Sequence, residues 1–184
     1  MIRYTIRRAI LIVIALLAPV LSHAQQHTHV NPATQHDSRE LQRAARALGI
    51  AVHSAKVRAS NEFVSAFSSI TRAHADALIV QANPLTIDYQ KQIADLAAQN
   101  RLPSLFFMRQ FVHEGGLIAY GANLEDQYRR AARYVAKIFE GARPADLPVE
   151  QPTKFDLVIN LKTAKALGIK IPETILLRAN EVIP

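Results

Sequence analysis

Short apolar runs alternate with amphipathic stretches along most of the chain. Apolar residues three or four positions apart between Ser38 and Gly49 predict a helix with a capping serine and a terminal glycine. The continuous run ALIV at residues 77–80 is typical of a strand covered on both faces. Further helices are expected after Ser60 or Asn61, after Asn83-Pro84, at 125–139 and at 163–167, further strands at 50–57, 102–108, 117–120 and 155–161, and an extended tail at 169–184.

This alternation of helices and short apolar strands predicts an α/β fold with a mostly parallel sheet and helices on both faces. In such sheets, ligands bind in the loops that follow the carboxyl ends of the strands. The loops expected at that edge are 81–85, 109–116 and 121–123. Candidate binding residues are therefore sought in these three loops first.

The first 24 residues have the pattern of a secretion signal. Arg3, Arg7 and Arg8 form a basic start, residues 9–21 are apolar, and a small-residue site ends at Ala24. The apolar run is too short for a membrane-spanning helix, which needs about 20 residues. We therefore predict a cleavable signal peptide over residues 1–24 and a periplasmic location for the remainder.

Residues 25–38 are polar and lack an apolar period, so we predict a disordered linker that leads into an α/β domain at 39–184. The linker contains His27, His29 and His36. A weak metal-binding tail is the alternative interpretation of these histidines. A solvated linker is favoured because nothing in the pattern completes a fixed set of ligands.

The formal charge of +7 suggests nucleic acid as a partner, but the charge is not concentrated. Three positive charges belong to the predicted leader. The densest remaining cluster is Arg129, Arg130 and Arg133, and Glu125 and Asp126 lie just upstream on the same expected helix. Such a mixture is typical of a solvated helix face with ion pairs one turn apart, so no nucleic-acid partner is expected.

The familiar signatures of catalysis are missing from the sequence. It has no phosphate-binding glycine loop, no Gly-x-Gly-x-x-Gly and no serine in a Gly-x-Ser-x-Gly turn. His113-Glu114 begins like a zinc helix, but Leu117 stands where a second histidine is required. The absence of cysteine excludes disulfides and thiolate metal sites. We expect no enzyme, no catalytic residues, no cofactor and no metal.

Polar and aromatic residues at two expected strand ends are the candidate binding residues. Arg109 can hold a carboxylate with two hydrogen bonds, with Gln110 beside it and Phe111 as the wall of an apolar pocket. The alternative is that Arg109 pairs with a nearby acid and Phe111 belongs to the core. Asn83 is the second candidate, although Asn-Pro is first a turn former. Asn123 is expected to cap the long helix.

Three stretches carry a resemblance to a known family. They are GGLIAYG at 115–121, YRRAA at 128–132 and, most specifically, LPVEQPTKFDLVINLKTAKALG at 147–168. The likeness continues to the end of the chain through LLRANEV at 176–182 and covers about residues 39–184. In these stretches the sequence resembles the TrpX-like ABC-transporter substrate-binding proteins.

The resemblance implies an extracytoplasmic solute-binding component of an ABC importer with the type I periplasmic-binding fold. Two α/β lobes of such proteins close on a small solute, and the loaded protein docks on a permease driven by an ATPase. The implied solute is a small molecule such as an amino acid or a related compound. Asn83, Arg109, Gln110 and Phe111 occupy the family's strand-end loops and are carried over as candidate ligand contacts.

The resemblance is to the C-terminal half of the family. We therefore expect largely one lobe, plus C-terminal segments from about residue 116 that return toward an absent first lobe. Two alternatives to solute capture follow from this shortening. One is a lone-lobe interaction module, whose exposed apolar surface favours a homodimer. The other is a non-functional truncated remnant.

Overall fold

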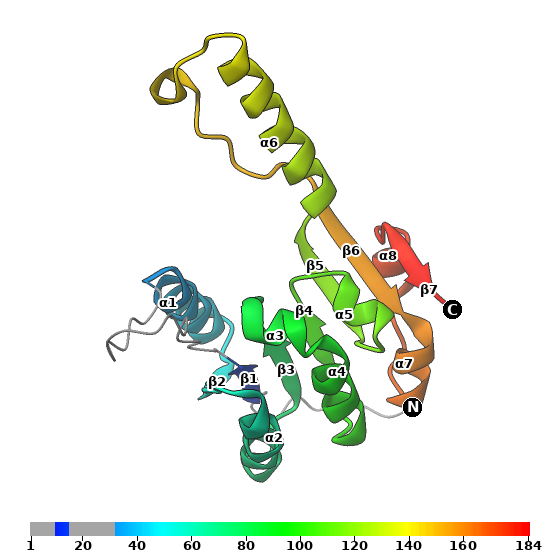
Figure 1. The fold of residues 1–184 in the computed structure, drawn as a ribbon. Coiled ribbons are helices and arrows are strands. Elements are labelled where there is room, and N and C mark those ends of the chain that lie inside the picture. Colours follow the sequence, from blue (N-terminus) through cyan, green and yellow to red (C-terminus); the bar gives the residue numbers. More distant parts are fainter. Residues whose placement is uncertain (1–9, 15–31) are drawn as a thin grey trace.

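The computed structural model describes residues 10–14 and 32–184, arranged as one seven-stranded sheet with flanking helices and a projecting arm (Figure 1). The predicted cleavage site at Ala24 and most of the predicted linker lie outside the described residues. The strands are β1 (Ile10–Ile14), β2 (Ala51–Ala55), β3 (Ala77–Val80), β4 (Ser104–Phe106), β5 (Ile118–Ala122), β6 (Phe155–Asn160) and β7 (Glu181–Ile183). The helices are α1 (Pro32–Ala47), α2 (Phe63–Arg72), α3 (Pro84–Asp88), α4 (Gln90–Gln99), α5 (Gln110–His113), α6 (Leu124–Phe139), α7 (Leu161–Ala166) and α8 (Glu173–Leu176), with 3-10 turns η1 (Ser60–Glu62) and η2 (Pro144–Asp146).

The strands lie in the order β2-β1-β3-β4-β5-β6-β7. Every neighbouring pair is parallel except β5 and β6, which are antiparallel. The first five strands follow the order 2-1-3-4-5, one of the common orders of doubly wound α/β sheets. The prediction of an α/β fold with a mostly parallel sheet is therefore confirmed.

Both faces of the sheet are covered, as the continuous apolar run of β3 predicts. Leu78 and Val80 belong to the main core with side chains of α2, α4 and α5, including Phe67 and Phe111. Ile79 belongs to a second cluster, together with Leu41 of α1. Because neighbouring residues of a strand point to opposite faces, one apolar strand serves both layers.

Two segments differ from their predicted structure. Helix α1 begins at Pro32, six residues before the predicted capping residue Ser38 and within the stretch predicted as a linker. Proline is favoured in the first turn of a helix, and no helix-breaking residue follows before Gly49. The tail at 169–184 is not simply extended, because it forms α8 and then β7, which pairs with β6.

The segment Ile10–Ile14 lies within the predicted signal peptide, yet it is strand β1 of the sheet. It pairs in parallel with β2 on one side and β3 on the other. Cleavage after Ala24 stays a prediction. Among the helices of the described residues, none is both long enough and apolar enough to span a bilayer.

Between β5 and β6 the chain leaves the sheet as an arm, residues 123–154, which consists of α6, η2 and a returning segment (Figure 1). Asp126 is buried, and its carboxylate accepts a hydrogen bond from Arg130 at 2.8 Å and pairs with Lys154 at 3.0 Å. Arg130 also pairs with Glu150 at 3.2 Å. Because Glu150 and Lys154 lie on the returning segment, these charges join both limbs of the arm.

The arm should loosen in acid. Hydrogen bonds from Lys154 and Arg130 lower the pKa of Asp126 below its ordinary value of 3.8. A lowered folded-state pKa adds stability that is present above 3.8 and is lost as the pH falls through the folded-state value. We expect the hydrogen-exchange protection factors of the α6 amides to fall over that interval. Asp126→Asn should already exchange faster at pH 6 and lose this acid-dependent step. If the α6 amides of the wild-type protein lost protection only at higher pH, the assignment of this step to Asp126 would be wrong.

Candidate functional site

The carboxyl ends of β3, β4 and β5 meet at one edge of the sheet, because these strands are parallel neighbours. A small depression of about 60 Å³ lies at this edge between the loop after β4 and the root of the arm. Its lining includes Arg109 and Gln110, two of the predicted site residues. The full lining is Phe107, Met108, Arg109, Gln110, Gly121, Ala122, Asn123, Leu124, Glu125 and Asp156.

Arg109 reaches this depression with its charge already partnered. Its guanidinium pairs with Glu181 of β7 and lies 3.9 Å from the Oδ2 of Asp156. His113 Nε2 lies 3.4 Å from the other carboxylate oxygen of Glu181. The structure therefore matches the alternative interpretation, in which Arg109 pairs with acids of its own chain. Gln110 is exposed beside it and keeps its amide open to solvent.

Phe111 does not line the depression. Its side chain is 1% exposed and stacks on Phe106, with 4.6 Å between the ring centroids. Residues 110–113 form the helical turn α5, which the sequence analysis placed in an irregular loop. This turn directs Phe111 into the core, which matches the alternative interpretation and not the wall of a solute pocket.

Asn83 caps α3, as an Asn-Pro turn former can. Its Oδ1 accepts a hydrogen bond from the Thr86 backbone N–H at 3.1 Å, and its own N–H donates to Thr86 Oγ1 at 2.9 Å. This reciprocal pair is a capping box, with Pro84 in the first turn. The capping role uses the Asn83 oxygen and leaves the amide nitrogen for other contacts.

Two buried polar atoms at the end of β3 have no hydrogen-bond partner among the described residues. They are the acceptor Gln81 Oε1 and the donor Asn83 Nδ2. Most buried polar groups in proteins are paired, and an unpaired one costs about 1–3 kcal/mol. Gln81 is the first residue of the expected strand-end loop 81–85 and is not among the predicted site residues. Its signal is an amide residue placed directly after a fully apolar strand.

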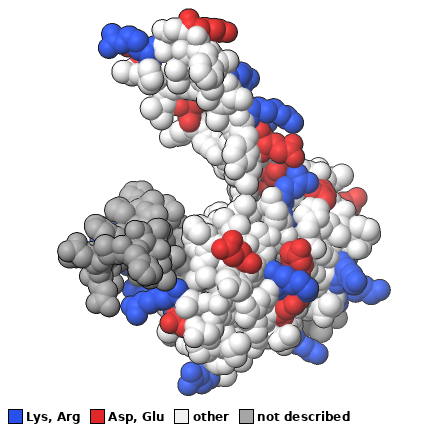
Figure 2. Space-filling model, viewed as in Figure 1, with Lys and Arg blue, Asp and Glu red and all other residues white. Residues whose placement is uncertain are grey.

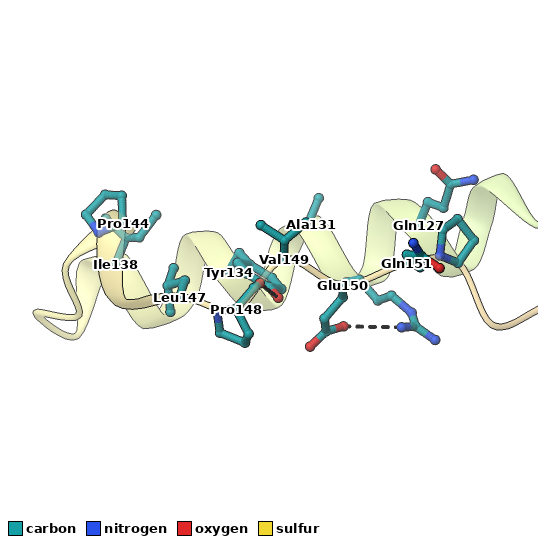
Figure 3. Close-up of a pocket in the computed structure, with 12 residues that line it drawn as sticks. Gln127, Ala131, Tyr134, Ile138, Pro144, Leu147, Pro148, Val149, Glu150 and Gln151 are labelled. Carbon is teal, nitrogen blue, oxygen red and sulfur yellow. Dashed lines mark hydrogen bonds and ion pairs between the residues drawn. The ribbon is translucent and has the colours of Figure 1, made fainter. Parts of the chain in front are cut away.

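A larger groove of about 490 Å³ lies on the arm, between α6 and the returning segment (Figure 3). Its wall is largely apolar, with Ile138, Leu147 and Val149 among the lining residues. Its charged groups and its tyrosine hydroxyl are used within the arm, because Arg130 pairs with Glu150 and the Tyr134 hydroxyl donates to the Pro148 carbonyl. We therefore place the candidate site at the strand ends and not in this groove.

Charged side chains of both signs are mixed over the face of the molecule shown in Figure 2. In the described part of the chain, no three His, Asp or Glu side chains gather in a way that could hold a metal ion. His27 and His29 of the predicted tail lie outside the described residues. His36 lies within α1. The polar chemistry of the candidate site therefore comes from amides and from the Arg109 ion pairs.

Asn123 holds the root of the arm against this edge. Its Oδ1 accepts a hydrogen bond from the Asp126 N–H at 2.7 Å and so caps α6, as the sequence predicts. Its Nδ2 donates to both carboxylate oxygens of Asp156, at 3.0 and 2.9 Å. Asp156 therefore accepts hydrogen bonds from Asn123 of the arm and also lies beside the Arg109 guanidinium. These contacts link the two sides of the depression.

Comparison with known proteins matches the chain to a family of substrate-binding proteins. Residues 28–183 match the family model described as ABC transporter substrate binding protein. The chain is 26% identical over 114 residues to the tyrosine-binding protein of Clostridioides difficile (strain R20291), a match over 62% of this chain and 33% of that protein. The family is one of binding proteins and not an enzyme class.

Solved structures give the same result for the fold. A conserved domain protein from Vibrio cholerae O1 biovar eltor matches with a TM-score of 0.77 and 26% identity, over 95% of this chain and 54% of that one. A Streptococcus protein solved in complex with L-Trp matches with a TM-score of 0.76 and 23% identity, over 96% of this chain and 56% of that one. The chain thus spans about half the length of these structures and a third of the curated relative. It belongs to the ABC transporter substrate-binding protein family.

Proposed function

We propose that the protein is the extracytoplasmic solute-binding component of an ABC importer, without catalytic activity of its own. It captures an aromatic amino acid, the class bound by its relatives, and delivers this solute to a membrane permease coupled to an ATPase. Its family membership and the tyrosine- and L-Trp-binding relatives support this function. A periplasmic location follows if the predicted signal peptide acts.

The observation that carries the proposal is the unpaired donor and acceptor at the end of β3. Both atoms are buried, so a solute would reach them only when the loop 81–85 opens. Asn83 Nδ2 can then donate to a carboxylate, and Gln81 Oε1 can accept from an ammonium group. A free amino acid offers both groups on neighbouring atoms. Arg109 is not free to bind the carboxylate of the solute, because its guanidinium already pairs with Glu181 and lies beside Asp156.

The proposal is tested by thermal unfolding of the full chain with L-tyrosine, L-tryptophan and their N-acetyl amides. A solute present at 100 times its dissociation constant stabilises the folded state by about 2.7 kcal/mol. We expect the free amino acids to raise the Tm and the capped ones, which lack both charges, to leave it unchanged. A folded sample with no shift from a broad set of amino acids would count against solute capture.

The matched variants are Asn83→Asp and Asn61→Asp. Aspartate at 83 keeps the capping oxygen of α3 but replaces the NH₂ donor with a negative charge that repels a carboxylate. Asn61 is exposed in η1 and does not line the strand-end depression, so its variant adds the same charge outside that lining. We expect Asn83→Asp to lower the apparent affinity for the solute, measured from the shift in Tm, at least about tenfold. Asn61→Asp should keep the wild-type shift. Equal shifts would remove Asn83 from the site.

A lone-lobe interaction module is the second candidate function. The observation that favours it is the exposed apolar face of α6, where Tyr128 is 73% and Phe139 87% exposed. The occupant of this face would be a second copy of the chain. Sedimentation of the same samples separates the two candidates, because a dimer that forms without any response to solute favours the module. A monomer that responds to solute favours capture.

A further inference from the structure

Strand β1 occupies an inner position of the doubly wound sheet. In the order 2-1-3-4-5, strand 1 lies between strands 2 and 3, and Ile10–Ile14 holds this place. Ile10 to Ile14 pair with Ala51 to Ala55 on one side, and Leu11 to Ile14 pair with Ala77 to Val80 on the other. The sequence ILIVI is apolar throughout, as suits a parallel strand covered on both faces.

The sheet depends on β1 for its continuity. Among the described strands, β2 pairs only with β1, and β3 meets β2 only through β1. Helix α1 lies between β1 and β2 in the chain, and its Leu41 packs with Val52 of β2 against Ile79 of β3. Without β1, both β2 and β3 would expose an edge of unpaired backbone groups.

The same five residues form the centre of the apolar run in the predicted signal peptide. A segment with a paired strand on each side cannot at the same time be extended in an export channel or reach a peptidase. We propose that Ile10–Ile14 is a structural strand of the folded protein and that folding and export are exclusive fates of this segment. A chain that folds before export therefore retains its first 24 residues.

The test uses the absence of cysteine from the chain, which makes any introduced pair unique. Val13 and Ser54 are register partners in the parallel strands β1 and β2. Neighbouring strands are about 4.8 Å apart, within the range that a disulfide spans. In the full chain, Val13→Cys with Ser54→Cys should form an intramolecular disulfide under mild oxidation.

The matched control moves one cysteine by one residue. Val13→Cys with His53→Cys shifts the pair out of register by one residue. We expect the in-register pair to cross-link at least about tenfold faster than the control pair. Equal rates in the two pairs, or no cross-link in a folded in-register variant, would overturn the proposal. Neither result depends on solute binding, so failure here is distinguishable from failure of the proposed function.

A second measurement applies if the cysteine variants fail to fold. Proline within an inner strand removes a ladder hydrogen bond, so Ile12→Pro should abolish the exchange protection of the Ala51–Ala55 amides. Leu17→Pro interrupts the same apolar run of the predicted leader outside the strand and should leave that protection unchanged. Strands β4 to β6 are the internal reference. Protection of β2 that is equal in both variants would overturn the proposal.

Discussion

Replacement of Phe111 by alanine is expected to lower the free energy of unfolding by about 3–5 kcal/mol, the usual cost of deleting a fully buried phenylalanine. Phe111 is 1% exposed and stacks on Phe106 within the main core. The truncation therefore leaves a cavity beneath α5 and removes an aromatic pair. Urea unfolding followed by circular dichroism measures the change through the midpoint concentration.

The control for this variant is Phe139→Ala. Phe139 lies on the arm and is 87% exposed, so its removal should change stability by no more than about 0.5 kcal/mol. The two variants delete the same atoms and differ only in burial. If Phe111→Ala kept its unfolding midpoint but lost the solute-induced rise in Tm, Phe111 would be a pocket residue after all and its place in the core would be wrong.

Gly121→Ala is expected to disrupt both stability and solute binding. A methyl group at this position would lie 1.9 Å from the carbonyl oxygen of Phe107, a backbone atom that cannot rotate away. The loop after β4 and the end of β5 must then separate, at a cost of about 3 kcal/mol, the upper end for overpacked sites. Gly121 and Phe107 both line the strand-end depression. The same movement should therefore abolish the solute-induced shift in Tm.

Gly49→Ala supplies the comparison for this substitution. Gly49 follows α1 with φ near +69°, and an added methyl group meets nothing within 4 Å. Its variant should lose about 1–2 kcal/mol through the left-handed backbone alone and keep the response to solute. Urea unfolding and the thermal shift are measured on both proteins. A Gly121→Ala protein with wild-type stability would show that the two loops are not packed as described.

Much of the fold follows from local pattern. The run ALIV predicts β3 at its observed bounds, and the helix expected at 125–139 is observed as α6 with Asn123 as its cap. These elements are marked by continuous or periodic apolar residues and by capping side chains, which act within a few positions. Residues 10–14 show the limit of such patterns. A short apolar run fits a buried strand as well as a leader, and only the partners β2 and β3 distinguish the two.

The candidate site is less accessible to sequence reasoning, because its decisive partners are distant in the chain. The sequence brings Arg109 to a strand end, but Glu181, which neutralises it, lies 72 residues away. The inward direction of Phe111 depends on the short turn α5, which has no periodic signal of its own. Gln81 becomes a candidate only when the structure shows that its oxygen is buried without a partner among the described residues.

The root of the arm has a mechanical consequence. Two antiparallel strands carry the chain out of the sheet and back, with Gly121 opposite Asp156 in their ladder. The charges of Asp126 and Arg130 join the two limbs beyond that point, so α6 and the returning segment move together. Asn123 and Glu125 at the root form one wall of the depression, and Arg109 forms part of the other. A rotation of the arm about its root would change the width of the depression, and the sixteen-residue helix α6 would turn it into a larger displacement at the far end of the arm. A partner that binds the far end of the arm would therefore also alter the depression at its root.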